Sequence, residues 1–343
     1  MDTFKKYGSI DNSYQRKLLD KYRLYGFDKK EVSWVLLEKV HGSNFSATIV
    51  NNEVIWGKRT SFLKTIEEQK DFNDSDIVVK KYSGCAKSIY QNMVKLYPDV
   101  ESVHIYGELY GGIYPGYETD KFIQKGIYYS SNIDFIVFDI CYSKIITVEN
   151  EMKESVDKLI YTYLDHTDVV SICDGLNMPV LKPIKTGTFD EILSIDPDTF
   201  ESEIYLLHNL PKIDGNIAEG FVLKPNKTVR MPSGSRCIVK NKSKGFAEMT
   251  HVKVKTHKKS TPLSPETIAA IDTSLCYVTK ARIGSVESKL GKKEKDNMRK
   301  LTGIIVSDAM KDIKKDHPDL INKKNKKSIG TALYKAIFEM LNN

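Results

Sequence analysis

Lysines that are followed three positions later by a glycine are the first candidates for covalent chemistry in this sequence. Once deprotonated, a lysine amine can attack the α-phosphate of a nucleotide to form a phosphoramidate, and the glycine would let the backbone approach that nucleotide closely. The pattern occurs seven times, starting at Lys5, Lys39, Lys81, Lys212, Lys242, Lys300 and Lys327. Because the spacing is this common, only the surrounding residues can identify the reactive lysine.

Lys39 is the candidate with a matching set of residues after it in the chain. Glu108 and Glu219 stand at the boundaries of apolar segments. Their carboxylates suit Mg²⁺, directly or through water, or ribose hydroxyls. Lys240 and Lys242 are two positions apart in a predicted strand, so both would lie on one face and stabilise a five-coordinate α-phosphate. The ordinary alternative is that these groups form surface ion pairs or are solvated.

Lys212 is the main competitor, because Lys212-Ile213-Asp214-Gly215 has the Lys-x-Asp-Gly form used by DNA ligases and capping enzymes. However, Pro211 precedes it, and Asp-Gly is a strong turn signal. We therefore predict that this copy of the pattern is a turn.

The segments around Lys39 and the residues after it together resemble the RNA ligase 2 family, which contains the phage double-strand RNA ligase and trypanosome-type RNA-editing ligases. The most specific segment is Glu38–Phe45, in which His41 replaces the aspartate of DNA ligases and capping enzymes. Gly107–Pro115 is similar to the editing ligases, whereas Leu37 replaces a basic residue of the phage enzyme. The resemblance covers essentially the whole chain.

The resemblance implies three steps: adenylation of the enzyme by ATP, transfer of AMP to an RNA 5′-phosphate, and attack by a 3′-hydroxyl that expels AMP. It implies catalytic roles for Lys39, His41, Lys240 and Lys242. The implied ATP-binding residues are Glu38, Lys39, Asn44, Arg59, Glu108, Phe138, Glu219, Lys224, Lys240 and Lys242. The implied cofactor besides ATP is Mg²⁺ or Mn²⁺, with Glu108 and Glu219 as its ligands.

Some of these residues have more specific implied roles. Phe138 would stack on the adenine, and Lys224 would contact the phosphates. Arg59 and Asn44 would also bind RNA, Asn44 at the 5′-phosphate end. The ordinary alternatives are a core aromatic for Phe138, a surface residue for Arg59 and a structural histidine for His41.

Apolar residues recur with both strand-like alternation and helical spacing, which predicts an α+β domain that would position these residues. Regular βαβ units are absent, which favours antiparallel sheets, and the resemblance implies an ATP-grasp-like adenylyltransferase (nucleotidyltransferase) domain over residues 1–245. The predicted strands are Ser33–Leu37, Phe45–Val50, His104–Tyr110, Ile133–Tyr142, Phe221–Lys224 and Cys237–Val239, with a helix over Ile77–Tyr97.

The C-terminal third is strongly basic. Residues 240–343 hold 23 Lys and Arg against 11 Asp and Glu, whereas residues 1–239 hold 29 against 34. We predict a basic linker over 246–262 and a small all-α domain over 263–343, with helices in Pro265–Ile271, Leu301–Ile313 and Ile329–Leu341. The basic residues of 246–343 would grip RNA phosphates, although lysines that only keep the domain soluble are the ordinary alternative.

Composition excludes several classes of protein. The 343 residues are 41% hydrophobic and 28% charged, as in soluble folded chains, and no apolar run approaches the ~20 residues that span a bilayer. Five cysteines without a CxxC pair, and no secretory signal, predict reduced thiols and a cytoplasmic location without membrane partners.

The leading hypothesis is an ATP-dependent RNA ligase, acting as a monomer, that seals nicks with 3′-hydroxyl and 5′-phosphate ends in duplex RNA. The nearest alternative is an editing- or repair-type ligase that prefers bridged or RNA/DNA hybrid nicks. A non-catalytic RNA-binding relative is a third hypothesis, against which the joint presence of Lys39, Glu108, Glu219, Lys240 and Lys242 argues. His41 and the lack of an evident C-terminal OB-fold disfavour a capping enzyme or a DNA ligase.

Overall fold

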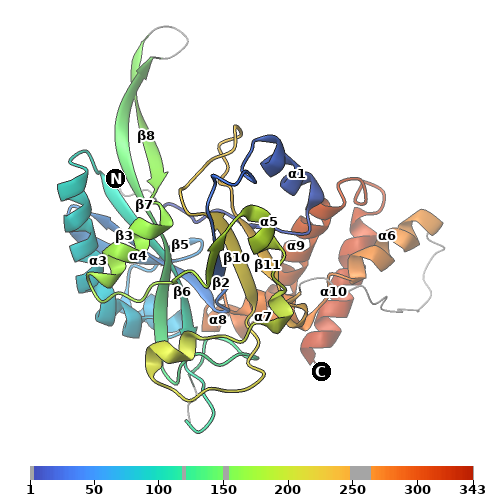
Figure 1. The fold of residues 1–343 in the computed structure, drawn as a ribbon. Coiled ribbons are helices and arrows are strands. Elements are labelled where there is room, and N and C mark those ends of the chain that lie inside the picture. Colours follow the sequence, from blue (N-terminus) through green and yellow to red (C-terminus); the bar gives the residue numbers. More distant parts are fainter. Residues whose placement is uncertain (1–3, 118–120, 150–153, 248–263, 343) are drawn as a thin grey trace. The chain divides into compact units, whose positions relative to one another are not determined.

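The computed structural model describes residues 4–117, 121–149, 154–247 and 264–342. Internal contacts divide the chain into two units, Met1–Lys242 and Ser243–Asn343 (Figure 1). The sequence placed this boundary near residue 245, and most of the predicted linker 246–262 lies outside the described residues. Among the described residues, none of the helices combines the length and the apolar content that crossing a bilayer requires.

The first unit contains two sheets, which confirms the predicted α+β class with antiparallel sheets. A five-stranded sheet has the order β1 (Asp11–Asn12), β11 (Val239–Lys242), β10 (Gly220–Pro225), β2 (Trp34–Glu38) and β9 (Lys185–Gly187). A six-stranded sheet has the order β5 (Ser61–Phe62), β4 (Glu53–Lys58), β3 (Ser43–Val50), β6 (Ser102–Gly111), β7 (Ile133–Glu149) and β8 (Ser155–Tyr163). Neighbouring strands are antiparallel except for the pair β1 and β11.

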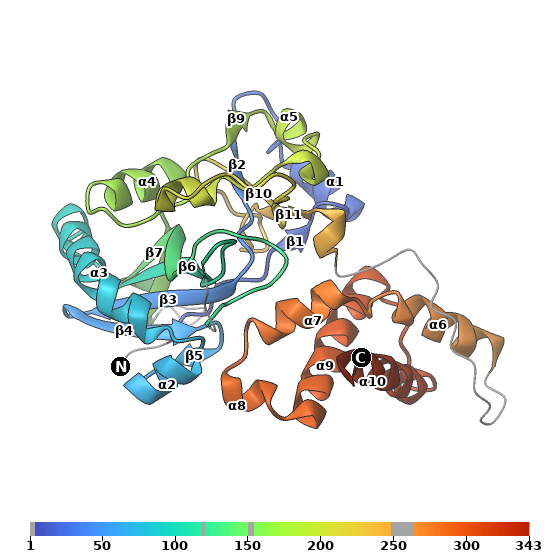
Figure 2. The ribbon, with the colours of Figure 1, turned by 90° about the horizontal axis from the view of Figure 1, so that it is seen from below.

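Helices cover one face of the five-stranded sheet. α1 (Arg16–Leu24) and α5 (Phe189–Leu193) pack on it through a core that includes Trp34 and Phe221 (Figure 2). Since side chains alternate along a strand, the neighbours of these core residues lie on the opposite face. That second face carries Lys224 on β10 and, by register with β10, Lys240 and Lys242 on β11.

The six-stranded sheet is covered by α3 (Asp76–Leu96), which confirms the helix predicted over Ile77–Tyr97 (Figure 2). Tyr82, Ala86, Ile89 and Met93 recur at helical spacing along α3 and pack against the strands. α4 (His166–Asp174) contributes to the same core, and α2 (Ile66–Asp71) and two 3₁₀ turns, η1 (Pro197–Thr199) and η2 (Ile204–His208), complete the unit.

The strand β7 is longer than the predicted strand Ile133–Tyr142. Its second half pairs with β8 as a two-stranded ribbon that projects from the rest of the sheet (Figure 1). Along Lys144–Glu149 half-buried and exposed residues alternate. The continuous apolar run ends at Tyr142, which is why the sequence pattern stopped there.

The second unit is helical, as predicted. After η3 (Lys244–Phe246) it contains α6 (Pro265–Leu275), α7 (Lys280–Glu287), α8 (Lys292–Lys295), α9 (Met298–Asp316) and α10 (Lys326–Asn342). Its core is formed by aliphatic side chains of these helices, among them Ile305 on α9 and Leu333 on α10. The sequence predicted α6, α9 and α10 but missed α7 and α8, which are too short to show helical periodicity.

Candidate active site

Lys39 follows directly after β2, in the segment of chain that connects the five-stranded sheet to β3 of the six-stranded sheet. Its amide N–H donates a hydrogen bond to the carbonyl oxygen of Gly220, at 2.8 Å, which holds this segment beside the start of β10. Its Nζ lies 2.7 Å from Oε2 of Glu219, and its side chain remains 22% exposed. The amine is therefore held in place and still accessible to a substrate.

Glu219 lies among two lysine amines and a histidine ring. Its Oε1 lies 2.8 Å from Nζ of Lys242, and its Oε2 lies 3.4 Å from Nδ1 of His41 as well as contacting Lys39. Burial raises the pKa of the Glu219 carboxyl, but the ammonium groups of Lys242 and Lys39 outweigh burial and hold the pKa well below its ordinary value. Glu219 is therefore an anionic anchor for both lysines at neutral pH.

Two glycines allow the backbone to bring these groups together. At Gly220 φ is +144°, and a Cβ there would lie 2.1 Å from the carbonyl oxygen of Asn241 on β11. At Gly42 a Cβ would lie 2.2 Å from the carbonyl oxygen of Leu109 on β6. The glycine three positions after Lys39 is thus required for close approach to a neighbouring strand, whereas the sequence suggested only an approach to the nucleotide.

Tyr129 is a residue of this site that the sequence did not indicate. Its hydroxyl oxygen accepts a hydrogen bond from the His41 amide at 2.8 Å. Burial and then the charge of Glu38 raise its pKa well above the ordinary value, with Glu219 and Glu108 contributing. Tyr129 lies in an irregular segment, so no strand or helix periodicity could have singled it out.

Glu38 has a buried carboxylate with an unused acceptor. The residue is 4% exposed, and its Oε1 finds no hydrogen-bond partner among the described residues. Burial raises its pKa to about 7, although hydrogen bonds from Ser202 and the Glu203 backbone act in the opposite direction. Because buried polar atoms are nearly always paired, this oxygen fits a donor on a ligand, such as the exocyclic amino group of adenine.

Asn44 and Glu108 are direct cross-strand neighbours on β3 and β6. Phe45, the next residue along β3, belongs to the core under α3, so Asn44 and Glu108 are on the opposite face of the sheet. The register of β6 against β7 shifts between Tyr106 and Gly107, and this bulge leaves Phe138 as an extra residue. The Phe138 ring is half-buried, with its centroid 5.0 Å from that of Tyr7.

Lys224 differs from its predicted place on the phosphates of ATP. Its Nζ lies 2.7 Å from Oδ1 of Asp139 and 3.1 Å from the Phe138 carbonyl oxygen, and its side chain is only 5% exposed. Arg236 and the Tyr7 hydroxyl also bind the Asp139 carboxylate. Asp139 would be a buried, unpaired charge without these partners, so Lys224 serves here as its counter-ion and fixes the backbone of Phe138.

The remaining predicted residues have different surroundings. Lys240 lies opposite Val222 and shares a strand face with Lys242. The Arg59 guanidinium donates to Oγ of Ser9 at 3.1 Å. In the described parts of the chain no group of three or more His, Cys, Asp or Glu residues could hold a metal ion. The metal role of Glu108 and Glu219 stays a prediction.

Lys212, the competing lysine, lies in a surface turn, as predicted. Its Nζ lies 2.7 Å from Oε2 of Glu201, and the side chain is about half exposed. Asp214 and Gly215 form the turn, with φ of +74° at Gly215. The geometry therefore favours Lys39 over Lys212 as the candidate nucleophile.

Comparison with known proteins gives the family. Residues 32–242 match the family model described as RNA ligase, and residues 264–339 match the one described as T4 RNA ligase 2 C-terminal. RNA-editing ligase 2, mitochondrial, of Trypanosoma brucei brucei is 25% identical over 377 residues, covering 93% of this chain and 85% of the relative. RNA-editing ligase 1, mitochondrial, of the same organism is 23% identical over 348 residues, covering 84% and 71%.

A solved structure, Naegleria gruberi RNA ligase with PPi, is 14% identical with a TM-score of 0.41. The match covers 72% of this chain and 58% of that structure. The first family model covers more than half of the chain, and the second covers the helical unit. The chain therefore belongs to the RNA ligase 2 family.

Proposed function

We propose that this chain is an ATP-dependent RNA ligase that seals nicks with a 3′-hydroxyl and a 5′-phosphate in duplex RNA. The observation that carries the proposal is the cluster in which buried Glu219 holds the amines of Lys39 and Lys242 at 2.7 and 2.8 Å. Attack on an anionic phosphate needs a positioned amine and a second cation that stabilises the developing charge. This cluster supplies both.

In the first step Lys39 loses a proton to solvent, and its Nζ attacks the α-phosphorus of ATP. An N–P bond forms, the bond from the α-phosphorus to the bridging oxygen breaks, and pyrophosphate leaves. Lys242 and Lys240 stabilise the five-coordinate phosphate from one face of β11. Glu38 Oε1 accepts a hydrogen bond from the adenine amino group, and Phe138 stacks on the ring.

In the second step an oxygen of the RNA 5′-phosphate attacks the AMP phosphorus, the N–P bond breaks, and Lys39 takes back a proton. In the third step the RNA 3′-hydroxyl attacks the 5′-phosphorus, loses its proton, and AMP leaves. His41, held through its amide by Tyr129, acts on the adenylated RNA. Asn44 binds the 5′-phosphate end and Arg59 binds an RNA phosphate or the 3′-hydroxyl strand.

A divalent metal, Mg²⁺ or Mn²⁺, would neutralise charge on the ATP phosphates. Glu108, which lies opposite Asn44 on the neighbouring strand, and Glu219 are the proposed protein ligands, directly or through water. Both oxygens of Glu219 already contact ammonium groups. The monomeric state and the cytoplasmic location stay predictions.

Covalent labelling tests the proposal. The protein, first freed of bound AMP with pyrophosphate, is incubated with Mg²⁺ and ATP or GTP labelled in the α-phosphate. We expect acid-resistant, hydroxylamine-insensitive label from ATP that is lost in Lys39→Ala and retained in Lys212→Ala. Absence of label in the AMP-free wild-type protein would refute the proposal and favour a non-catalytic RNA-binding relative.

The second candidate is an editing- or repair-type ligase, which the names of the two trypanosome relatives support. Sealing rates on three substrates distinguish it: a nick in all-RNA duplex, the same nick in an RNA/DNA hybrid, and two RNA ends bridged by a guide strand. Fastest sealing of the all-RNA nick supports the leading proposal. A clear preference for the bridged or hybrid substrate supports the second candidate.

A further inference from the structure

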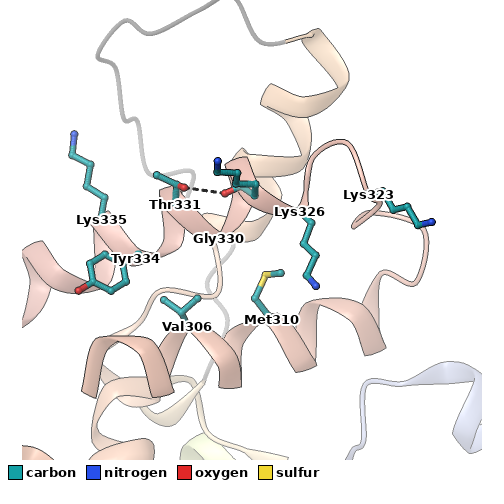
Figure 3. A pocket seen from close by; sticks show the side chains of 9 residues that line it. Val306, Met310, Lys323, Lys326, Gly330, Thr331, Tyr334 and Lys335 are labelled. Carbon is teal, nitrogen blue, oxygen red and sulfur yellow. Dashed lines mark hydrogen bonds between the residues drawn. The ribbon is translucent and has the colours of Figure 1, made fainter. Parts of the chain in front are cut away.

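A groove between α9 and α10 lies wholly within the helical unit. It has a volume of about 700 Å³, with Val306 and Met310 on α9 facing Gly330 and Thr331 on α10. Tyr334 and Lys335 lie at one end and Lys323 at the other (Figure 3). Figure 3 shows Lys326 extending from α10 toward Met310. The groove therefore combines an apolar floor with a cationic rim.

Three of the four lysines that line the groove have no ion-pair partner among the described residues. Four lysines line the groove, namely Lys323, Lys326, Lys327 and Lys335, and the lining contains no Asp or Glu. None of the ion pairs between described residues involves Lys323, Lys326 or Lys327. Lys335 has Glu339 at 3.9 Å as a loose, exposed partner.

The lysines also lie where a helix does not favour them. Lys326 and Lys327 begin α10, and the first turn of this helix contains no acidic residue. The positive end of the helix dipole makes cations unfavourable at this position. Folding alone therefore gives no reason for lysines here, whereas a bound anion would interact favourably with both the lysines and the dipole.

The loop that precedes α10 is ordered by its own side chains. Oδ1 of Asn322 accepts hydrogen bonds from the amides of Lys324 and Asn325, at 2.9 and 3.1 Å. Oδ1 of Asn325 accepts a hydrogen bond from the Asn322 amide at 2.9 Å, and Nδ2 of Asn325 donates to the Leu320 carbonyl oxygen at 2.8 Å. The backbone that carries Lys323 is thus held in place before any ligand binds.

Gly330 leaves one wall of the groove without a side chain. Glycine destabilises a helix interior relative to alanine. A Cβ at Gly330 would meet no atom within 4 Å. Because no neighbour requires glycine at this position, its effect is to leave the groove open.

We propose that the α9–α10 groove binds the phosphodiester backbone of the RNA substrate. The proposal rests on the proposed ligase function and assigns the basic charge of the C-terminal third to one surface. Lys323, Lys326 and Lys327 contact phosphate oxygens, Gly330 lets the backbone enter, and the apolar floor with Tyr334 contacts the sugars. An RNA backbone suits this groove better than an isolated anion because its phosphates repeat along a strand and could reach several of these lysines.

Binding of a fluorescent nicked RNA duplex, measured by anisotropy without ATP at several KCl concentrations, tests this site in the full chain. Replacing Lys323, Lys326 and Lys327 by Ala should weaken binding ~10–100-fold at low salt and reduce the slope of log K against log[KCl] by roughly 2–3. The matched control replaces Lys280, Arg299 and Lys311, which are exposed and equal in charge, and should weaken binding less than about 2-fold. Thermal unfolding should show that the groove variant is at least as stable as the wild type.

Gly330→Leu provides a test that leaves the charge unchanged. Leucine favours a helix but would occupy the groove, so RNA affinity should fall at least about 5-fold while the melting temperature does not fall. Gly284→Leu on α7, where a Cβ also has open space, should bind RNA like the wild type. Equal losses in the groove and control variants, or wild-type affinity in both groove variants, would overturn the proposal. Labelling of wild-type Lys39 by ATP tests the ligase function separately, so failure of either proposal is recognisable.

Discussion

At the scale of single residues, this site depends on which buried groups have partners and which do not. Glu219 is satisfied by Lys39, Lys242 and His41 before a nucleotide arrives. Glu38, by contrast, keeps one buried oxygen without a partner among the described residues. The first residue holds the amines of Lys39 and Lys242 in place, and the second is available to recognise a ligand.

The burial of Glu38 predicts that the free energy of unfolding depends on pH. The pKa of Glu38 is about 7 in the folded chain and about 4.3 when unfolded. Between these values the folded chain binds a proton that the unfolded chain releases, so stability is fully present below about pH 4 and is lost as the pH rises through 7. The loss amounts to roughly 4 kcal/mol, at about 1.4 kcal/mol per pH unit.

Thermal unfolding of Glu38→Gln between pH 5 and pH 8 checks this prediction in AMP-free protein. Glutamine keeps the shape and does not titrate, so the variant should gain stability over the wild type as the pH rises. Glu53→Gln, at an exposed position on β4, serves as the control. A difference between Glu38→Gln and wild type that is the same at pH 5 and pH 8 would contradict the assignment.

At the scale of elements, local irregularities of the strands position the site. The β7 bulge displaces Phe138, and Gly220 lets the start of β10 approach β11 so that Glu219 reaches Lys242. In the helical unit an ion-pair cluster joins α7 to α9. Arg282 is only 1% exposed, and its guanidinium binds the carboxylates of Asp308 and Asp312.

Arg282→Ala should therefore destabilise the helical unit. The change leaves two half-buried carboxylates without their cation and opens a space in the core, which we expect to cost about 3 kcal/mol. Chemical denaturation of the full chain, followed by circular dichroism, measures the effect. Lys280→Ala, on the same helix and exposed, should change stability by less than about 0.5 kcal/mol, and an equally small effect of Arg282→Ala would refute the structural role.

At the scale of the whole molecule, the residues of the two proposals lie in different units of the chain. Lys39, Glu108, Glu219 and Lys242 all belong to Met1–Lys242, whereas the lysine-lined groove belongs to Ser243–Asn343. Each unit also has its own hydrophobic cores. The proposed nucleotide chemistry and the proposed RNA binding can therefore be separated by truncation.

A chain that ends after Gly245 should still label itself with ATP, within about 3-fold of the full chain, because its sheets and cores are complete. It should seal nicked RNA at least about 10-fold more slowly, because it lacks the groove and its phosphate contacts. Single-turnover labelling and sealing on the same nicked duplex measure both steps. Unchanged sealing would contradict a role of the helical unit in RNA binding, and loss of labelling would show that this unit contributes to nucleotide chemistry.

Much of this organisation could be predicted from the sequence. Apolar periodicity identified α3, α9 and α10, and the structure brings together Lys39, Glu219 and Lys242 of the predicted nucleotidyltransferase site. The apolar periodicity is local, because it depends on side-chain spacing along one helix. The sequence did not predict the short helices α7 and α8 or the second half of β7, because their local patterns are weak.

The sequence by itself determined the residue types, their order, the helical periodicity and the basic C-terminal third. Only the tertiary structure decided which charges pair. Glu219 pairs with Lys39, 180 positions away, and Lys224 pairs with buried Asp139 rather than remaining exposed to bind ATP. The tertiary structure also brought Tyr129 to His41 and left one oxygen of Glu38 without a partner among the described residues. The physical reason is that burial and ion pairing depend on neighbours contributed by distant strands, which spacing along the chain does not encode.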